Sequence, residues 1–262
     1  MPRNFSHPHG VPLMSLHQAH DQRALIARWR ALASAARLRV RVLTEVKGEK
    51  IIYLESTRRK DSPDINYLSA GVHGDEAGAA WGLLAWAEDN IATLQQKAFV
   101  IFPCMNPHGL QGNTRVDHRG LDINRRFHLD DDPISGPWRK IIAARRWRIG
   151  LCLHEDYDAQ GCYVYELSQH RGSLSSRILG ECINGIALDP RRSIDGRPSR
   201  SGIIHRRIIP SDLPGMPEAI ELFRLGCPTT LTFETPSEFS LDDRVQAQAS
   251  FVKAALHHAM NP

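Results

Sequence analysis

A histidine and a glutamate lie three positions apart in the segment His73-Gly74-Asp75-Glu76. They directly follow residues 65–72, an apolar run that is typical of a buried strand. The pair is therefore expected at the C-terminal end of a strand, where open α/β sheets place their ligands. Imidazole nitrogen and carboxylate oxygen are ligands that Zn²⁺ accepts in catalytic sites. Taken alone, the same motif also fits a polar turn after a strand.

Two further ionisable residues occupy the same position relative to predicted strands. His154 ends the apolar run 149–153, and Glu234 ends the β-branched run 229–233. Because the carboxyl ends of parallel strands meet at one edge of a sheet, both residues can converge with the first pair. Alone, His154 also fits a histidine satisfied inside the core, and Glu234 fits an acid that caps a helix.

Together these residues complete a known kind of catalytic site. His73, Glu76 and His154 provide two imidazoles and one carboxylate, a donor set that leaves one coordination position of Zn²⁺ open for water. Glu234 is then not needed as a ligand. A carboxylate next to the reacting water is well placed to act as its general base.

The loop between the two histidines is rich in Gly, Asn, Asp and Arg. It contains Arg115 and Arg125, with Asn124 directly before the second arginine. One guanidinium can hold a substrate carboxylate through two parallel hydrogen bonds, and another can stabilise an oxyanion. The alternative is a solvated loop in which arginines pair with neighbouring aspartates, which suits Arg119 and Arg126 better.

Strand and helix patterns alternate through most of the chain, which favours an α/β fold with a mostly parallel sheet. The predicted helices cover 15–36, 77–95, 137–147, 173–187, 216–225 and 241–258, and the predicted strands cover 38–44, 51–55, 65–72, 98–103, 149–153, 162–167, 202–209 and 229–233. No repeat or linker interrupts the pattern. We therefore predict a single domain over 1–262, with a loose lead-in at 1–14 and the chemical motifs within 73–236.

The composition indicates a soluble globular protein. Hydrophobic residues make up 42% and charged residues 24% of the chain, and no apolar run is long enough to span a membrane. A net charge of +4 does not indicate a nucleic-acid partner. The five cysteines form no CxxC pair, and no signal-peptide pattern precedes the fold. Buried thiols and a cytoplasmic location are therefore expected.

The order of the motifs resembles the zinc carboxypeptidase family, including compact bacterial members such as murein peptide amidases. More distantly, it resembles succinylglutamate desuccinylase and aspartoacylase. The motifs are HGDE (73–76), NPHG (106–109), TRVDHRGLDINRRF (114–127), LH (153–154) and TFETP (232–236). The resemblance implies a three-layer αβα sandwich around a twisted, mostly parallel mixed sheet of about eight strands.

The resemblance also implies a role for each residue of the candidate metal site. His73, Glu76 and His154 match the three ligands of one Zn²⁺ ion. Glu234 matches the general base that passes the proton to the leaving group. Asp75, which lies between two of the matched ligands, is expected to support the site at most.

The matched residues of the loop are expected to handle the substrate. Arg115 matches the arginine that polarises the scissile carbonyl. Asn124 and Arg125 match the pair that grips the terminal carboxylate of the substrate. The resemblance therefore implies a substrate with a free carboxylate.

The sequence departs from the digestive members of the family at two places. Those enzymes carry a mobile tyrosine before the general base, whereas residues 208–222 contain no tyrosine, so any lid must use another residue. Glu155 and Asp156 follow the third ligand, where the digestive members have a hydroxyl residue and a tyrosine. These acids can support a ligand histidine or read a positive group on the substrate.

The predicted function is a zinc-dependent metallocarboxypeptidase that cleaves an amide bond next to a free C-terminal carboxylate. One alternative is an N-acyl amino acid deacylase, whose small anionic substrates would suit the arginine-rich segment 191–207 if that segment is more than a charged surface. The other is a non-catalytic binding domain, which the complete set of polar site residues disfavours. No pattern in the sequence sets an oligomeric state or the preferred side chain at the cleaved end.

Overall fold

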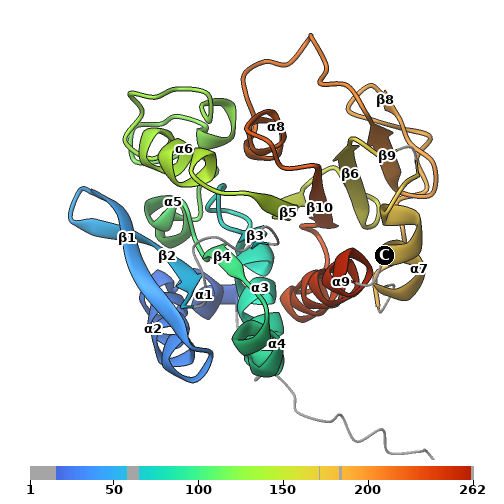
Figure 1. Cartoon of the computed structure of the whole chain (residues 1–262). Helices are drawn as coiled ribbons and strands as arrows, with labels where there is room; N and C mark the ends of the chain where they lie inside the picture. Colours follow the sequence, from blue (N-terminus) through green and yellow to red (C-terminus); the bar gives the residue numbers. More distant parts are fainter. Residues whose placement is uncertain (1–15, 58–64, 171, 183–184, 261–262) are drawn as a thin grey trace, which may run out of the picture.

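The computed structural model describes residues 16–57, 65–170, 172–182 and 185–260, so the predicted lead-in at 1–14 lies outside the described chain. An eight-stranded sheet has the order β1-β2-β4-β3-β5-β10-β6-β9. Its strands are β1 Leu38–Val46, β2 Glu49–Ser56, β3 Ile65–Ser69, β4 Phe99–Phe102, β5 Trp147–Asp156, β6 Tyr163–Ser168, β9 Ile203–Arg206 and β10 Thr229–Pro236. Figure 1 shows this sheet running through the middle of the molecule.

The sheet is mixed, with a parallel centre. Neighbouring strands are parallel from β4 through β3 and β5 to β10, and the outer pair β6 and β9 is also parallel. The pairs β1 with β2, β2 with β4 and β10 with β6 are antiparallel. The carboxyl ends of the four central strands therefore lie at one edge, which confirms the predicted α/β class.

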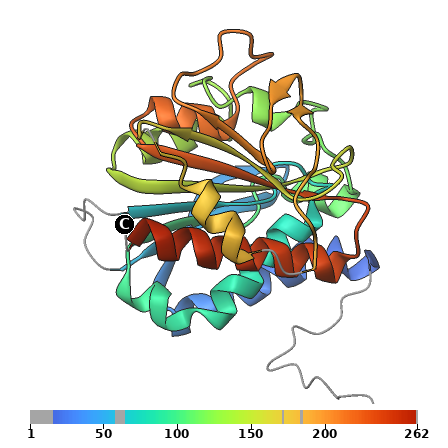
Figure 2. The ribbon, with the colours of Figure 1, turned by 90° about the vertical axis from the view of Figure 1, so that its right-hand side faces the viewer.

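Helices cover both faces of the sheet, as Figures 1 and 2 show. They are α1 Leu16–Ala19, α2 Gln22–Ala35, α3 Ala77–Asp89, α4 Ile91–Gln96, α5 Pro107–Gly112, α6 Ser135–Ala143, α7 Ser175–Cys182, α8 Glu218–Arg224 and α9 Leu241–Met260, with a 3₁₀ turn at Ile123–Arg125. Residues of α2, α3, α7 and α9 form one apolar core with the sheet, and residues of α6 and α8 form another on the opposite face. The three-layer arrangement is confirmed.

Two predicted helices are divided in the structure, and one short hairpin was not predicted. The helix expected at 15–36 is two helices, because the side chain of Asp21 accepts a hydrogen bond from the Ala24 amide and starts α2. The helix expected at 77–95 is interrupted at Asn90, between α3 and α4. A two-stranded hairpin, β7 Ser193–Ile194 with β8 Arg197–Pro198, has strands too short to leave a periodic signal.

Helix α3 packs unusually closely on its neighbours at two glycines. A Cβ atom on Gly82 would lie 2.4 Å from the Cβ of Gln248 in α9. A Cβ atom on Gly78 would lie 2.3 Å from the Oε1 of Glu155 in β5. Small residues one turn apart therefore let α3 approach α9 and the end of β5, and this contact fixes the start of α3 at the edge of the sheet.

Within the described residues, none of the helices combines the length and apolar character that a membrane crossing requires.

Candidate metal centre

The structure brings the predicted metal ligands together at the carboxyl edge of the sheet. His154 lies in β5, and Glu234 is its register partner in the neighbouring parallel strand β10. His73 follows β3, the other neighbour of β5, and Glu76 is the N-cap residue of α3. The strand order thus places side chains that are far apart in the sequence side by side.

His73, Glu76 and His154 form a buried cluster in which each side chain is at most 3% exposed. The Glu76 carboxylate lies between the imidazoles: its Oε1 is 2.5 Å from His73 Nδ1, and its Oε2 is 2.8 Å from His154 Nδ1. One candidate ligand atom from each residue lies within 4.8 Å of the other two.

This donor set fits a divalent metal ion. Two ligand atoms bound to one Zn²⁺ at about 2.1 Å can lie at most about 4.2 Å apart, so shifts below about 1 Å would bring all three into range. Within the described residues, this is the one group of three His, Cys, Asp or Glu residues with such spacing.

Asp122 supports the cluster from the side of the loop. Its Oδ1 accepts a hydrogen bond from Nε2 of His73 at 3.1 Å, which leaves Nδ1 as the candidate ligand atom of that imidazole. Its Oδ2 accepts hydrogen bonds from Nε and Nη2 of Arg115, at 3.2 and 3.1 Å. From the sequence, Asp122 is expected only as a partner of the loop arginines, and its contact with His73 was not predicted. Its only local signal is its position as the cap of the 3₁₀ turn.

The mutual contacts of these groups shift their protonation. Burial opposes charge on Glu76, but His73 and His154 overcome it and lower the pKa of Glu76 to about 2. Burial likewise opposes charge on His73, whereas Glu76 and Asp122 raise its pKa to about 9. In the metal-free cluster the imidazoles therefore hold protons against the Glu76 carboxylate, and a metal ion would displace these protons, because a ligating histidine is neutral.

Glu234 lies beside the cluster without joining it. Its side chain is half-buried, and no group in the described chain donates a hydrogen bond to its carboxylate. Burial raises the pKa of Glu234 well above its usual range, and Glu76 adds to the rise, while His154 and Arg115 oppose it. A carboxylate with a raised pKa next to a metal site has the properties of a general base.

The predicted substrate-binding residues lie in the loop that carries Asp122, and Arg115 lies close to the cluster. Nη1 of Arg115 is 3.8 Å from Oε1 of Glu76, and the Arg115 side chain is 44% exposed, so its guanidinium is accessible to a molecule bound at the cluster. The side-chain oxygen of Asn124 accepts a hydrogen bond from the Glu218 backbone amide at 2.8 Å, which leaves its NH₂ group to point elsewhere. Arg125 Nη1 donates to the Asn124 carbonyl at 3.0 Å.

The aspartates of the loop hold the remaining arginines, as expected. Arg119 bonds to Asp117 and Asp132, and Arg126 bonds to Asp132. These pairs are structural, and they keep the loop that carries Arg115 in place.

The acids after the third ligand have different roles. Glu155 contacts no ligand histidine: it accepts hydrogen bonds from the Gly78 amide and from Thr235, and it pairs with Arg244 at 2.7 Å. Burial raises the pKa of Glu155 to about 7, although Arg244 opposes this. Asp156 accepts a hydrogen bond from the Tyr163 hydroxyl at 3.0 Å. Glu155 therefore neither supports a ligand histidine nor is exposed enough to contact a substrate, the two roles expected from the sequence.

Glu218, in α8, is another buried residue that the sequence analysis missed. Its carboxylate accepts hydrogen bonds from the hydroxyl groups of Tyr67 and Ser69, and its backbone amide holds Asn124. Burial raises its pKa. Glu218 therefore ties α8 and the loop to β3.

Comparisons with known proteins agree with this geometry. Residues 64–149 match the family model described as the succinylglutamate desuccinylase/aspartoacylase catalytic domain. No curated protein sequence matches the chain significantly.

Solved structures show the same fold. A proposed metallopeptidase from Shewanella denitrificans OS217 is 23% identical, with a TM-score of 0.81 over 92% of this chain and 91% of that one. A metallo-carboxypeptidase from Burkholderia cenocepacia is 17% identical, with a TM-score of 0.68 over 92% and 69%. Carboxypeptidase A from Helicoverpa armigera is 15% identical, with a TM-score of 0.67 over 95% and 75%.

The chain therefore has the fold of the zinc carboxypeptidases, and the predicted resemblance to the zinc carboxypeptidase-like family is supported. The family model covers His73, Glu76, Arg115 and the Asn124-Arg125 pair, and it ends before His154.

Proposed function

We propose that this protein is a zinc-dependent hydrolase that cleaves an amide bond next to a free carboxylate, in the manner of a metallocarboxypeptidase. The observation that carries the proposal is the cluster of two buried imidazoles and one buried carboxylate, with the unbonded carboxylate of Glu234 as a fourth side chain beside it. A metallo-carboxypeptidase from Pseudomonas aeruginosa, 19% identical with a TM-score of 0.58, forms a complex with a derivative of succinic acid. This supports a carboxylate-bearing substrate.

His73, Glu76 and His154 would hold the metal, which the donor set and its burial favour. When bound there, Zn²⁺ would polarise the scissile carbonyl and lower the pKa of a water molecule. Glu234 takes the proton from the attacking water and returns it to the leaving amine, for which its raised pKa is suited.

Arg115 and the following loop residues would bind the substrate. The Arg115 guanidinium, close to Glu76 and partly exposed, stabilises the negative charge that develops on the carbonyl oxygen. The NH₂ group of Asn124 and the guanidinium of Arg125 grip the free carboxylate, because both offer hydrogen-bond donors and lie on adjacent residues.

A second candidate function is the removal of an acyl group from an N-acyl amino acid. The match of residues 64–149 to the succinylglutamate desuccinylase/aspartoacylase catalytic domain favours it. The same residues would serve as ligands and base, and the two functions differ in what lies on the acyl side of the scissile bond.

Metal analysis combined with a substrate panel tests the proposal. We expect about one Zn²⁺ per chain by elemental analysis, and we expect hydrolysis of peptides or N-acyl amino acids that is lost with a chelator and restored by zinc. Cleavage of C-terminal peptides but not of N-acyl amino acids selects the carboxypeptidase, and the reverse selects the deacylase. A protein without metal and without either activity would instead be a binding domain.

We also propose that the chain forms one domain over 1–262, since the main sheet uses strands from Leu38 to Pro236. The buried thiols of Cys104, Cys152 and Cys227 suit a reducing, cytoplasmic environment. The mild net charge gives no reason to propose a nucleic-acid partner.

A further inference from the structure

Glu218, the first residue of α8, is a fully buried carboxylate that has no step in the proposed chemistry. Its Oε2 accepts a hydrogen bond from the Ser69 hydroxyl at 2.8 Å, and its Oε1 accepts one from the Tyr67 hydroxyl. Tyr67 is itself held by Nε1 of Trp138 in α6, which donates to the Tyr67 hydroxyl oxygen at 2.8 Å. The side chain of Glu218 therefore anchors the start of α8 to β3, the strand that leads to His73.

The backbone amide of Glu218 holds Asn124, one of the two residues proposed to bind the substrate carboxylate. This amide donates to the side-chain oxygen of Asn124 at 2.8 Å. Because a backbone N–H can only donate, the Asn124 atom that it contacts must be the oxygen, and the NH₂ group is left for another acceptor. One residue thus connects the loop to the central sheet: its amide is bonded to Asn124, and its carboxylate is bonded to β3.

The segment before α8 holds Arg125, the other residue of the pair. The amide of Met216 donates to the Arg125 carbonyl at 3.0 Å, and the amide of Phe127 donates to the Met216 carbonyl at 3.2 Å. A Cβ atom on Gly215 would lie 2.6 Å from the Arg125 carbonyl oxygen, so only glycine permits this approach. The start of α8 and the segment before it therefore contact both residues of the pair.

These contacts join the pair to the strand that positions a proposed metal ligand. Ser69, which is bonded to Glu218, ends β3, and His73 follows four residues later. In the proposed reaction the substrate has only its last residue between the scissile carbonyl and the terminal carboxylate, a span of at most about 3.6 Å. The substrate cannot compensate for a wrong distance between the metal and the carboxylate-binding groups, so the protein has to fix that distance.

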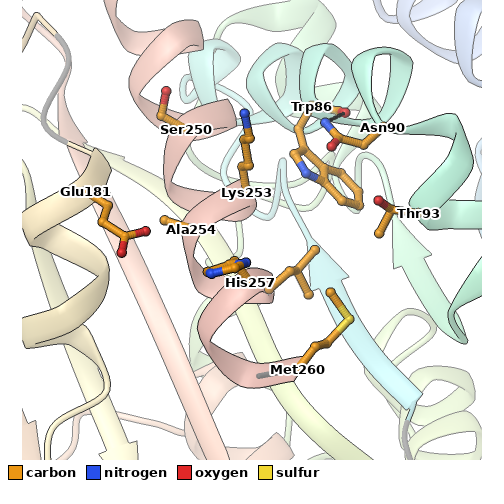
Figure 3. A pocket seen from close by; sticks show the side chains of 10 residues that line it. Trp86, Asn90, Thr93, Glu181, Ser250, Lys253, Ala254, His257 and Met260 are labelled. Carbon is orange, nitrogen blue, oxygen red and sulfur yellow. Dashed lines mark hydrogen bonds between the residues drawn. The ribbon is translucent and has the colours of Figure 1, made fainter. Parts of the chain in front are cut away.

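A groove of about 570 Å³ between α9, α7 and the end of α3 is remote from this arrangement, as Figure 3 shows with Trp86, Asn90 and Lys253 in its lining. Asn90 lies fourteen residues beyond Glu76, about 20 Å along the axis of α3. A C-terminal residue bound at the metal centre is too short to reach this groove, so its carboxylate depends on the nearer loop.

We propose that segment 215–218, anchored by the buried carboxylate of Glu218, positions Asn124 and Arg125 for recognition of the substrate carboxylate. Glu218 is a positioning residue: it acts through Asn124 and does not touch the substrate. This inference rests on the proposed function. Loss of the anchor weakens binding of a free carboxylate and leaves binding of the same ligand without its carboxylate unchanged.

The test compares dansyl-labelled alanyl-alanine with its C-terminal amide. Both are titrated into the zinc-loaded Glu234→Gln protein, and the Kd of the amide divided by the Kd of the acid measures carboxylate recognition. Glu218→Gln keeps the side-chain size but replaces one of the two acceptor oxygens with an NH₂ group. It should lower this ratio about three- to tenfold.

Glu221→Gln is the matched control. Glu221 is equally buried and lies one turn further along α8, but its carboxylate pairs with Arg139 and Arg224. A general loosening of α8 would lower the ratio in both variants, whereas a positioning role lowers it in Glu218→Gln alone. The ratio for Glu221→Gln should therefore equal that of the parent protein.

Gly215→Ala gives a second measurement that leaves the Glu218 side chain intact. The added Cβ would displace the Arg125 backbone and should also lower the ratio at least threefold. Gly180→Ala is its control, because a Cβ on Gly180 would meet nothing within 4 Å.

These binding outcomes do not depend on turnover. Unchanged ratios in Glu218→Gln and Gly215→Ala, or an equal fall in Glu221→Gln, overturn the positioning role while carboxylate recognition by the parent protein stands. A parent protein that binds the acid and the amide equally overturns both the positioning role and the proposed preference for a free carboxylate.

Discussion

The ends of strands β5 and β10 have two faces that differ in how their polar groups are satisfied. His154 and Glu234 point to the face that carries α8, because side chains alternate along a strand. Glu155 and Thr235, the next residue on each strand, point to the face that carries α3 and α9. The two pairs are neighbours in sequence and in register.

On the α3–α9 face the polar groups are bonded to one another. Glu155 accepts from three groups, and Gln248 donates to the His154 carbonyl and to Thr235. On the other face, Glu234 receives no hydrogen bond within the described chain. The Glu155 carboxylate and the Thr235 hydroxyl are thus satisfied internally, although Oε1 of Gln248 has no partner among the described residues, while the carboxylate of Glu234, the group proposed for chemistry, is left available.

Replacing Glu234 by Gln should have the largest effect. Because Gln cannot take a proton from water, kcat/KM should fall about 100- to 10,000-fold while the zinc content is unchanged. Steady-state kinetics on the best substrate and elemental analysis measure this.

Thr235→Val, one residue further on the opposite face, is the matched control. It removes hydrogen bonds to Glu155 and Gln248 and should lower the free energy of unfolding by about 1 kcal/mol with turnover retained. A Glu234→Gln protein with full activity would contradict the proposed mechanism.

Replacing Glu155 by Ala should mainly affect stability. It leaves the guanidinium of Arg244, whose side chain is 7% exposed, without its anion, and the free energy of unfolding should fall by about 3–5 kcal/mol. Urea denaturation of the metal-free protein measures this. Asp156→Ala, next in sequence and 24% exposed, is the control, with an expected change below about 1 kcal/mol. Equal losses in the free energy of unfolding for Glu155→Ala and Asp156→Ala would contradict the structural role assigned to Glu155 on the α3–α9 face.

Replacing Asp122 by Asn should act on metal binding without removing a ligand. The Asp122 carboxylate accepts from His73 Nε2, and its loss should weaken zinc affinity about 10- to 100-fold. Competition with a chelator of known affinity measures the change. Asp130→Asn, whose side chain is 85% exposed, is the control and should bind zinc as the wild type does. Unchanged affinity in Asp122→Asn would mean that His73 is oriented by other contacts.

The smallest expected effect concerns Asp132, a buried carboxylate that accepts hydrogen bonds from Arg119, Arg126 and two backbone amides. Burial opposes its charge, but the amides of Ser135 and Ile134 and two arginines lower its pKa. The folded state therefore binds its proton less tightly than the unfolded state, where the pKa is about 3.9. The stabilisation is complete above that value and is lost as the pH falls through the lower folded-state pKa.

Asp132→Asn tests this sign directly. The variant should be less stable than the wild type by about 1–2 kcal/mol near neutral pH, and the difference should shrink below about pH 4. Unfolding by urea at several pH values measures it. A difference that grows toward acid pH would show that the carboxylate is protonated in the folded protein.

The sequence predicted the layers and the placement of the candidate ligands because both depend on strong local patterns. A buried strand appears in the sequence as an apolar run, and an ionisable residue that ends the run is easy to identify. Parallel pairing then brings such ends together without further information. His73, His154 and Glu234 were located in this way, although their proposed roles stay predictions.

The supporting residues could not be predicted in this way. Asp122 contacts a histidine 49 positions away and stands in a loop already rich in acids, so no local pattern distinguishes it. Glu218 looks like an ordinary residue of a helix start until the fold buries it against Tyr67 and Ser69.

The register of β10 against β5 determines which parts of this protein can be exchanged to alter its substrate specificity. Glu234 and His154 are held opposite each other by backbone hydrogen bonds between neighbouring strands. Loops that contact the substrate can therefore be exchanged without altering the spacing between the proposed base and its neighbouring ligand. A graft that keeps Asp122 and Arg115 would redirect specificity while Glu234 and His154 keep their positions.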